Sequence, residues 1–475
     1  MNYKEAIDKP IFKTICNVAD RLDYPTYVVG GWVRDLLLDR KRKIEDIDFV
    51  CVGSGIILAQ NICDELGEDA ILKVFKNFGT AMISYNGENY EFVGARKESY
   101  RRDSRKPIIE DGTLEDDQNR RDFTINAMAI QLNAQQYGDF LDPFNGKNDL
   151  ENRIIKTPLD PDSTFSDDPL RMMRAVRFAN QLDFSIEKRT LEAIKRNAER
   201  LEIISQERIT DELNKIILSK KPSIGFKLLF ETKLLHQFFN ELCKLHGVEK
   251  INNHSHKDNF FHTLEVLDNI SIASDNLWLR WAAILHDIAK PQTKKYEEGI
   301  GWTFHAHEFI GSKMVKGIFK KLKLPLNTKM EFVRKMVALH LRPIVLAQDI
   351  VTDSAIRRLL FDAGDDIDCL MTLCDADITS KNPNKVKKYL ANFQLVRTKL
   401  KEVEEKDRIR NFQPPVNGNE IMEIFDIKTG KEIGQLKKLI KEAILDGEVE
   451  NDKKAALIFL NKKAKELNIR NRNEV

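Results

Sequence analysis

Two aspartates, Asp46 and Asp48, stand two residues apart in a short run of apolar residues. Successive side chains of a β-strand point to opposite faces, so both carboxylates would emerge on one face of such a strand. Hard divalent ions such as Mg²⁺ prefer carboxylate oxygens, and they bridge phosphates while orienting an in-line displacement. The pair therefore predicts a magnesium site for nucleotidyl transfer. An isolated pair of this kind is more often a solvated patch on an edge strand, so its weight depends on the neighbouring motifs.

A glycine turn precedes the two aspartates. Gly30 and Gly31 follow the β-prone residues 27–29, and Arg34 stands in the helix start that comes next. Two adjacent glycines let the backbone approach a triphosphate closely, and the N–H groups that open a helix favour negative charge. Such a turn alone is more often only a turn, but together with the aspartates it predicts a site that binds a nucleotide triphosphate.

A basic and polar cluster at residues 120–129 runs into a second apolar segment. Arg121 has the planar guanidinium that suits a phosphate, and Asp122 or Asn126 would hydrogen-bond a ribose hydroxyl. A helix cap with a surface ion pair would explain these residues equally well.

A third motif combines one carboxylate with several arginines. Asp168 and Arg171 lie three residues apart at the start of a helix and are therefore neighbours on its surface, with Pro169 near the first turn. Cytosine and adenine present an amino donor beside a ring-nitrogen acceptor, whereas uracil and guanine present the reverse, so this pair would accept C and A and reject U and G. Arg174 and Arg177 continue a stripe that winds partly round the helix. The alternative is a surface salt bridge, which contributes little to stability.

A separate constellation of histidines and aspartates follows downstream. Five of the chain's 9 histidines fall in this helical region, together with several aspartates that a helical bundle can bring near them. The sequence therefore predicts a second metal site, although a lone buried histidine is more often a satisfied core residue. The residues concerned are His262, His286, Asp287, His305, His307, His340, Asp375 and Asp377.

The type of secondary structure that must position these residues changes along the chain. Up to about residue 155, short β-prone runs alternate with turn residues and predict an α/β fold, whereas helical periodicity dominates from about Thr157. The predicted strands are 27–29, 47–52, 81–84, 90–93 and 127–131, and three of the predicted helices are 170–180, 189–201 and 207–218.

The composition fits a globular protein with several domains. The 475 residues exceed the length of one ordinary core, and the chain is 42% hydrophobic and 32% charged. A net charge of +2 gives no argument for nucleic acid, although the local runs 96–106 and 462–472 are basic. No apolar stretch approaches the ~20 residues of a membrane helix. Six cysteines without a CxxC pair predict reduced thiols and a cytoplasmic location.

The ordered set of motifs resembles the class II tRNA nucleotidyltransferase and bacterial poly(A) polymerase family over roughly the first 230 residues. The motifs are GGWVRD, DID, RRDFTINAMA, LDPFNGKNDL and DDPLRMMRAVRFA. The resemblance implies a nucleotidyltransferase head with a helical neck and metal binding by Asp46 and Asp48. It also implies nucleotide binding by Gly31, Arg34, Arg121, Asp168, Arg171, Arg174 and Arg177. The last four of these residues would select CTP and ATP.

Two further segments resemble parts of the same family. Residues 95–107 resemble the flexible loop that CCA-adding members use when they change from C to A, and their basic content suits a mobile segment near phosphates. Residues 206–213 resemble the later neck motif, although an ordinary charged helix would explain them too.

The downstream constellation resembles the HD superfamily, with the motif positions taken by His262, His286, Asp287 and Asp377. Asp375 is the competitor for the last position. An HD site would polarise a water for phosphoester hydrolysis, and HD-bearing members of the family show phosphatase or 2′,3′-cyclic phosphodiesterase activity. Residues 414–434 resemble the tail of these members, which implies contact with the RNA body through shape and phosphates.

We therefore expect an α/β head at 1–155, an all-α neck at 156–235, an HD-type helical domain at 236–390 and a helical tail at 391–475. The expected reaction adds C and A from CTP and ATP to the 3′ end of tRNA with Mg²⁺, and a second divalent metal would sit at the HD site. The alternatives are a poly(A) polymerase, a CC-only or A-only adding enzyme, and a protein that is mainly an HD phosphohydrolase. No membrane partner is expected.

Overall fold

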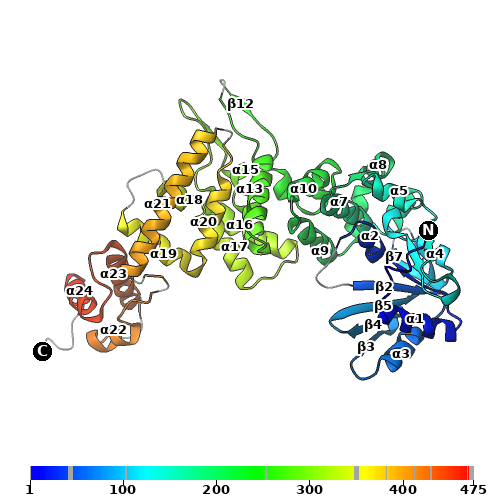
Figure 1. Ribbon diagram of the computed structural model, residues 1–475. Coiled ribbons are helices and arrows are strands. Elements are labelled where there is room, and N and C mark those ends of the chain that lie inside the picture. Colours follow the sequence, from blue (N-terminus) through cyan, green and yellow to red (C-terminus); the bar gives the residue numbers. More distant parts are fainter. Residues whose placement is uncertain are drawn as a thin grey trace. The chain divides into compact units, whose positions relative to one another are not determined.

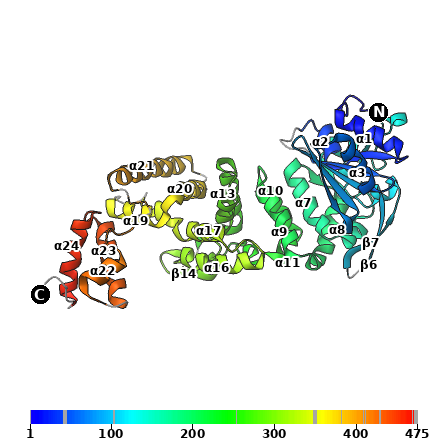
Figure 2. The same cartoon turned by 90° about the horizontal axis from the view of Figure 1, so that it is seen from below.

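The structure is a computed structural model that describes residues 2–40, 46–101, 104–251, 254–346, 352–380, 382–407, 409–410, 412–427, 430–467 and 469. The chain forms two compact units, an N-terminal unit (Met1–Cys243) and a C-terminal unit (Lys244–Val475), which Figures 1 and 2 show in two orientations. The finer division at residues 155, 235 and 390 stays a prediction.

The N-terminal unit is built on a seven-stranded sheet in the order β3-β4-β5-β2-β1-β8-β9. Neighbouring strands are antiparallel except β2 and β5, which are parallel. The strands are β1 (Thr26–Val29), β2 (Asp46–Cys51), β3 (Ile71–Phe75), β4 (Thr80–Tyr85), β5 (Glu88–Gly94), β8 (Ala129–Gln131) and β9 (Phe140–Leu141).

Helices α1 (Pro10–Arg21) and α3 (Gly55–Leu66) cover one face of this sheet. Phe49 of β2 is fully buried there, with its ring 4.9 Å from that of Phe92 and 5.7 Å from that of Phe12. Burying one such ring contributes about 1.5–3 kcal/mol to stability. Because side chains alternate along β2, this packing fixes which residues of the strand point to the other face.

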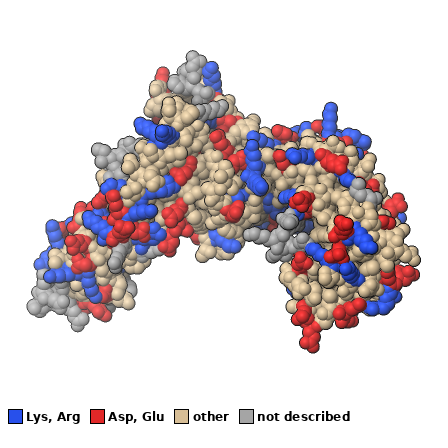
Figure 3. Space-filling model, in the orientation of Figure 1, with Lys and Arg blue, Asp and Glu red and all other residues tan. Residues whose placement is uncertain are grey.

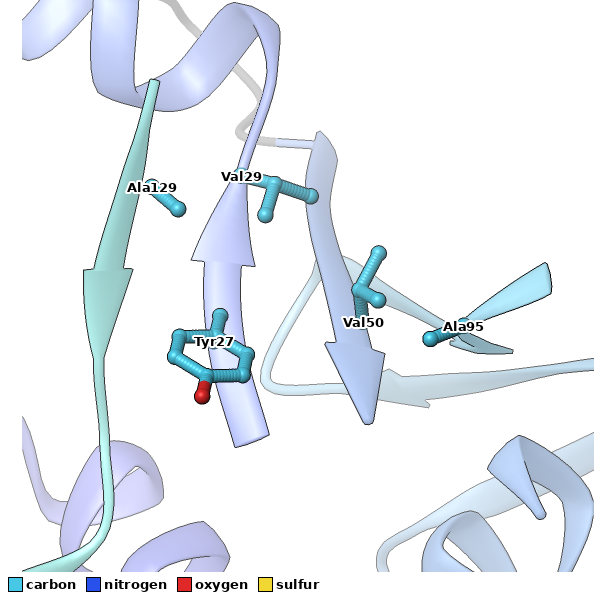
Figure 4. Close-up of a cluster of buried hydrophobic side chains, with 5 residues drawn as sticks. All are labelled: Tyr27, Val29, Val50, Ala95 and Ala129. Atoms are coloured by element: carbon cyan, nitrogen blue, oxygen red, sulfur yellow. The ribbon is translucent and has the colours of Figure 1, made fainter. Parts of the chain in front are cut away.

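The other face carries a small apolar cluster of Tyr27, Val29, Val50, Ala95 and Ala129, drawn in Figure 4. Val50 belongs to β2, and Val29 lies directly opposite Asp48 in the strand register. The cluster therefore supports the sheet beside the two aspartates.

The remaining elements of the N-terminal unit are mostly helical. The helix α7 packs on α9 and α10, and the short strands β10 and β11 pair in parallel. These elements are α2 (Gly31–Leu37), β6 (Arg96–Arg101), β7 (Ser104–Asp111), α4 (Leu114–Asn119), α5 (Gly146–Glu151), β10 (Ile154–Ile155), α6 (Pro161–Asp167), α7 (Leu170–Leu182), β11 (Ser185–Ile186), α8 (Lys188–Asn197), α9 (Gln206–Ile217), α10 (Pro222–Glu231), α11 (Leu234–Phe238) and α12 (Asn240–Cys243).

Most of the segment 95–107, expected to be a flexible loop, lies in the antiparallel hairpin of β6 and β7. Residues 102–103 lie outside the described residues. In this hairpin Arg96 lies opposite Asp111 and Lys97 opposite Glu110, and the register shifts between Ser99 and Arg101. Movement of this hairpin during the change from C to A stays a prediction.

The C-terminal unit is a helical bundle with two short antiparallel strand pairs, β12-β13 and β14-β15, near its start. Its central helices pack pairwise, α13 on α14 and α20, and α17 on α14 and α16. The elements are β12 (Lys250–Ile251), β13 (His254–Ser255), α13 (Asn259–Ala273), α14 (Leu277–Leu285), α15 (Lys290–Thr293), β14 (Lys295–Glu297), β15 (Gly301–Thr303), α16 (His307–Lys321), α17 (Thr328–Leu339), α18 (Leu341–Leu346), α19 (Asp353–Ala363), α20 (Ile367–Asp377), α21 (Pro383–Asp407), α22 (Gly418–Phe425), α23 (Lys431–Asp446) and α24 (Lys453–Glu466).

Helix α23 packs on α19 and is joined to it by ion pairs, and α22 and α24 pack on α23. Arg358 of α19 contacts Glu442 at 2.5 Å and Asp446 at 2.9 Å, both on α23. Figure 3 shows that basic and acidic side chains are interspersed over the visible face of both units. Among the described residues, no helix has the length and apolar character needed to cross a membrane.

Candidate active site and metal centre

Asp46 and Asp48 open strand β2 and share one face of it. Asp46 is exposed and Asp48 half-buried, whereas Ile47, Phe49 and Cys51 are fully buried on the opposite face. This is the alternation that the spacing predicts. An amide nitrogen of Asn89 on β5 lies 3.4 Å from a carboxylate oxygen of Asp46. The two carboxylates therefore lie on one side of the sheet, and their binding of Mg²⁺ stays a prediction.

Glu91 is a third carboxylate at this place, and the sequence analysis did not identify it. It lies opposite Asp48 in the parallel register of β2 and β5, and hence on the same face. Partial burial and the charge of Asp48 raise the pKa of the Glu91 carboxyl. Glu91 therefore adds negative charge beside Asp48 on this face of the sheet. Glu91 can be recognised as part of this site only from the pairing of β2 with β5, because a glutamate is common on the solvent face of a strand.

The glycine turn lies between Asp48 and Arg121. Gly30 has φ +75°, and a Cβ placed on it would lie 3.1 Å from Arg121 Nη1 and 3.4 Å from Asp48 Oδ2. A side chain at position 30 would therefore be strained and crowded. The close approach of backbone, guanidinium and carboxylate is the arrangement expected of a site for nucleotide phosphates.

Arg34 is buried and bonded to protein groups. Its Nη1 donates to Asn126 Oδ1 at 2.7 Å, and its Nε and Nη2 donate to Asp35 Oδ1 at 2.9 and 2.8 Å. These bonds tie the start of α2 to Asn126. Arg34 therefore supports the turn in this structure, and its contact with a nucleotide stays a prediction, as does that of Gly31 and Asn126.

Asp122 connects this region with helix α7. Its Oδ2 accepts a 2.7 Å hydrogen bond from Arg174 Nε, and its Oδ1 accepts from Asn126 Nδ2 and from the Phe123 backbone, both at 2.9 Å. Burial acts to raise the pKa of Asp122, but Arg174 and these hydrogen bonds outweigh it and lower the pKa to about 2. The carboxylate is therefore ionised at neutral pH.

A cavity of about 440 Å³ lies between the 120–122 segment, α7 and α9. Of the predicted nucleotide-binding residues, Arg121, Asp122, Asp168, Arg171 and Arg174 line it. Helix α9 adds four charged residues that the sequence analysis did not select as nucleotide-binding, namely Arg208, Asp211, Glu212 and Lys215. The cavity thus presents both acceptors and donors to a ligand.

Asp168 and Arg171 are held in this cavity by different partners. Asp168 caps the start of α7 by accepting from the Leu170 backbone at 3.1 Å, and its Oδ2 lies 3.9 Å from Arg208 Nη2. Arg171 Nη2 donates to the Arg120 carbonyl at 2.6 Å. Backbone anchors of this kind fix the direction of both side chains, which reading a base requires.

Arg177 does not line this cavity. Its guanidinium lies 4.1 Å from the centre of the Phe178 ring, and its Nε lies 2.8 Å from Glu212 Oε2. Burial lowers the pKa of Arg177 to about 10 despite Glu212. Arg177 therefore packs the neck, and its role in nucleotide binding stays a prediction.

The second constellation converges on Asp287. His286 and Asp287 follow α14, His307 begins α16, and His340 follows α17. All four residues are buried, with at most 6% of their surface exposed. His262 of α13 and Asp377 at the end of α20 complete the group, with His262 Nε2 3.0 Å from Asp377 Oδ1. The sequence analysis noted His307 and His340 but did not choose them as ligands.

Asp375, unlike Asp377, pairs with a residue outside this group. Its carboxylate forms an ion pair with Arg397 of α21, whose Nη1 lies 3.2 Å from Asp375 Oδ1. His305 is 80% exposed at its side chain and pairs with Glu297. Asp377 is therefore the aspartate of α20 that faces the histidines.

The histidine rings are oriented by their Nδ1 atoms. These lie 2.7–2.8 Å from backbone carbonyls for His286, His307 and His340, and 2.9 Å from Thr379 Oγ1 for His262. Donation from Nδ1 leaves Nε2 as a metal-ligating lone pair. Among the described residues, the Nε2 atoms of His286, His307 and His340 are buried without a hydrogen-bond partner, whereas Oδ2 of Asp287 has Lys290 Nζ beside it. Such a donor set fits a divalent metal ion.

The charged groups of this site shift one another's pKa. Burial acts to lower the pKa of His286, but Asp287 and Asp377 outweigh it and raise the pKa to about 10. Burial and the charge of His286 lower the pKa of His340 to about 4. Lys290 Nζ lies 2.5 Å from Asp287 Oδ2 and balances part of the negative charge.

Three family models match the chain. The Poly A polymerase head domain matches residues 26–156, the probable RNA and SrmB-binding site of polymerase A matches 183–245, and the HD domain matches 259–382. The matched segments contain the two carboxylate sites described above.

Curated relatives differ in how much of the chain they match. A CCA-adding enzyme of Lactobacillus helveticus is 38% identical over 47% of this chain, which spans about half (53%) of that protein. A multifunctional CCA protein of Aromatoleum aromaticum is 30% identical over 70% of this chain and 80% of its own length. An A-adding tRNA nucleotidyltransferase of Aquifex aeolicus is 30% identical over 67% of this chain and 38% of its own length.

Among solved structures, the chain is similar to the Bacillus stearothermophilus CCA-adding enzyme in complex with CTP. The TM-score is 0.63 at 25% identity, with 97% of this chain and 99% of that chain covered. Because the Aromatoleum protein is matched at 30% identity over four fifths of its length, the chain belongs to the class II CCA-adding enzyme and poly(A) polymerase family, with an HD domain.

Proposed function

We propose that the protein adds C and A residues to the 3′ ends of tRNA, using CTP and ATP. The observation that supports this proposal most strongly is the meeting of Asp48, the Gly30 backbone and Arg121 at one end of the sheet. In the reaction, the RNA 3′ hydroxyl attacks the α-phosphate of the nucleotide and pyrophosphate leaves. A Mg²⁺ ion held by Asp46 and Asp48 would help deprotonate the hydroxyl and stabilise the leaving group.

The chain's own residues then have separate tasks. Arg121 holds a phosphate, and the Gly30 turn lets the triphosphate approach the backbone. Asp168 accepts a hydrogen bond from the amino group of C or A, while Arg171 donates to the neighbouring ring nitrogen. Uracil and guanine would place a carbonyl against the carboxylate, which disfavours them.

The nature of the product distinguishes this proposal from its alternatives within the family. Purified protein is incubated with tRNA that lacks its CCA end, with CTP, ATP or both, and the ends are sequenced. The proposal expects CCA only when both nucleotides are present. ATP-only tailing of any RNA end would favour a poly(A) polymerase, and addition restricted to C or to A would favour a partial enzyme that works with a partner.

A second activity is the hydrolysis of phosphoesters. It is supported by the buried Nε2 atoms of His286, His307 and His340, which have no hydrogen-bond partner in the described part of the chain and are free to bind a metal ion. An HD site with a divalent ion would polarise a water for attack on phosphorus. RNA ending in a 2′,3′-cyclic phosphate and simple phosphate monoesters serve as test substrates. Asp287→Asn should abolish hydrolysis and leave CCA addition intact. Hydrolysis that survives this substitution would exclude the site as its source.

The proposed substrates imply a cytoplasmic location. Helices α22, α23 and α24 would contact the body of the tRNA through its shape and phosphates, as expected for duplex RNA. A protein ending before α22 should keep nucleotide selection but require more tRNA for half-maximal activity.

A further inference from the structure

Three guanidinium groups gather around the ring of Phe178 on α7. The guanidinium carbons of Arg34, Arg174 and Arg177 lie 5.1, 5.4 and 4.1 Å from the centre of this ring. A cation within about 6 Å of a ring centre is attracted by the negative charge of the ring face, and more strongly where water is excluded. Phe178 exposes only 7% of its surface. The attraction therefore acts in a site that holds little water.

The three arginines repel one another. Burial, together with the charges of Arg174 and Arg34, lowers the pKa of Arg177 to about 10, although Glu212 acts in the opposite direction. Each of the three arginines pairs with a different carboxylate. A carboxylate thus holds one arginine at a time, whereas the ring of Phe178 lies beside all three. The ring is therefore suited to keep three like charges together.

The same ring closes a circle of contacts between α2 and α7. Arg34 Nη1 donates to Asn126 Oδ1 at 2.7 Å, and Asn126 Nδ2 donates to Asp122 Oδ1 at 2.9 Å. Asp122 Oδ2 accepts from Arg174 Nε at 2.7 Å. Arg34 and Arg174 then meet again at Phe178. Because each contact restricts the next, the circle fixes the arginine of the glycine turn relative to that of the neck helix.

We infer that Phe178 is a positioning residue for the triphosphate of the incoming nucleotide. It holds the guanidinium groups of Arg34, Arg174 and Arg177 at a spacing that their mutual repulsion would otherwise widen. Guanidinium groups bind phosphate oxygens well, and a preformed group loses less freedom when the ligand binds. This inference rests on the proposed function, in which these arginines bind nucleotide phosphates, and it adds an uncharged residue that acts only through them.

Reading of the base depends on other anchors. Asp168 accepts a hydrogen bond from the backbone of Leu170, and Arg171 donates to the backbone carbonyl of Arg120. These anchors belong to the backbone and not to the ring of Phe178. Loss of the ring should therefore weaken the binding of phosphates and leave the choice between bases unchanged.

The test measures nucleotide binding and does not depend on catalysis. Equilibrium dialysis with the full chain and without RNA gives the Kd of labelled CTP and ATP, and competition gives that of CMP. Phe178→Leu keeps an apolar side chain but removes the ring face, so the Kd of CTP and of ATP should rise about tenfold. CMP lacks the β- and γ-phosphates, so its Kd should rise less than about threefold. Phe178→Tyr keeps the ring and should restore the binding of CTP.

A control and a double-mutant cycle separate positioning from support of the fold. Phe226→Leu is the matched control, because Phe226 is fully buried on α10, which packs on α7. It should lower the unfolding temperature and leave the Kd of CTP unchanged. In a chain that carries Arg177→Met, Phe178→Leu should weaken CTP binding by a smaller factor than in the wild type, because part of its effect passes through Arg177. Circular dichroism verifies folding, and Phe178→Met replaces Phe178→Leu if the latter does not fold.

Equal losses for CTP and CMP would overturn the inference, as would a loss of CTP binding of the same size in Phe226→Leu. Fully additive losses in the double-mutant cycle would also contradict it. A protein that binds CTP through Phe178 in this way but adds no nucleotide to tRNA would uphold the inference and contradict the proposed function. CCA addition by the wild type, together with an unchanged Kd for CTP in Phe178→Leu, would do the reverse.

Discussion

The acidic group on β2 and β5 contains one residue more than the sequence analysis identified. Asp46 and Asp48 are recognisable because they alternate with buried residues within one strand. Glu91 becomes their neighbour only through the parallel pairing of two strands that are far apart in the sequence. The within-strand pattern was predictable from local chemistry, whereas the third carboxylate depends on the sheet order.

Glu91→Gln tests whether this third carboxylate assists the metal. The substitution removes one negative charge and keeps the shape, so we expect nucleotide addition to fall about 10–100-fold, the range for residues that support metal ligands. The Mg²⁺ concentration for half-maximal activity should rise, while the ratio of C to A incorporation stays unchanged. Steady-state kinetics over a Mg²⁺ series measures both. An unchanged Mg²⁺ requirement would limit Glu91 to a structural role.

Asp122 provides a prediction about stability. Its folded pKa of about 2 lies below the value of about 3.9 for an unfolded aspartate, so its ionised form stabilises the fold. This contribution, about 2–3 kcal/mol at neutral pH, is fully present above about pH 5 and is lost as the pH falls from there toward 2. Asp122→Asn should therefore lower the free energy of unfolding at pH 7 and flatten its decline in acid.

Urea unfolding between pH 7 and pH 3 measures this effect. Asp162→Asn is the matched control, because Asp162 pairs with Arg196 at the surface and such pairs contribute about 0–1 kcal/mol. Equal losses for the two variants would show that the buried pair with Arg174 carries no special stability.

The local sequence pattern predicted the central strands and the neck helices well. The predicted helix 170–180 is α7 (Leu170–Leu182), and 207–218 is α9 (Gln206–Ile217). Strand β3 was missed because it is an edge strand: Ile71, Val74 and Phe75 are exposed, so no buried alternation marks it. The predicted helix 189–201 ends earlier, since α8 gives way to a 3₁₀ helix at Ala198–Ile203.

The cavity forms where α9 approaches α7. This contact also explains why the sequence analysis did not identify the lining residues of α9. Arg208, Asp211, Glu212 and Lys215 occupy ordinary positions of a charged amphipathic helix. Nothing in their spacing shows that they face Asp168 and Arg171. The local sequence pattern therefore predicted each helix, but it could not predict that the two helices contact each other.

Asp168→Asn tests the base-reading role of this helix pair. An amide can donate a hydrogen bond where the carboxylate only accepts, so rejection of uracil should weaken. The loss of a charged hydrogen bond of about 1.5–3 kcal/mol corresponds to a fall of about 10–100-fold in the ratio of kcat/KM for CTP to that for UTP. Competition between the two nucleotides measures it. Asp211→Asn, a change in the same cavity on α9, should leave the ratio near that of the wild type.

The two units hold separate candidate sites, the carboxylates of β2 in the first and the histidines around Asp287 in the second. The sequence change from β-prone to helical residues predicted an α/β part followed by helical parts. The convergence of His262, His286, Asp287, His307 and His340 was only partly predictable. Side chains from four helices meet there, and spacing along the chain does not show which histidines share one centre.

Thermal unfolding should show that the metal stabilises only the C-terminal unit. Metal bound only by the folded C-terminal unit stabilises that unit by about 2.7 kcal/mol when the free ion exceeds its Kd a hundredfold. Calorimetry with Co²⁺ should therefore raise the unfolding temperature of one transition, and Asp287→Asn should abolish the rise. A shift of every transition, or a shift that persists in Asp287→Asn, would contradict the assignment of the metal to this unit.

If the carboxylates of β2 drive nucleotide addition, single-turnover extension of tRNA that lacks its CCA end depends on them. With CTP and ATP present, the wild-type protein and Asp64→Asn, an exposed acid on α3, should complete the end at equal rates. Asp46→Asn should reduce extension to background while tRNA binding persists. Extension by Asp46→Asn at the wild-type rate would contradict the account.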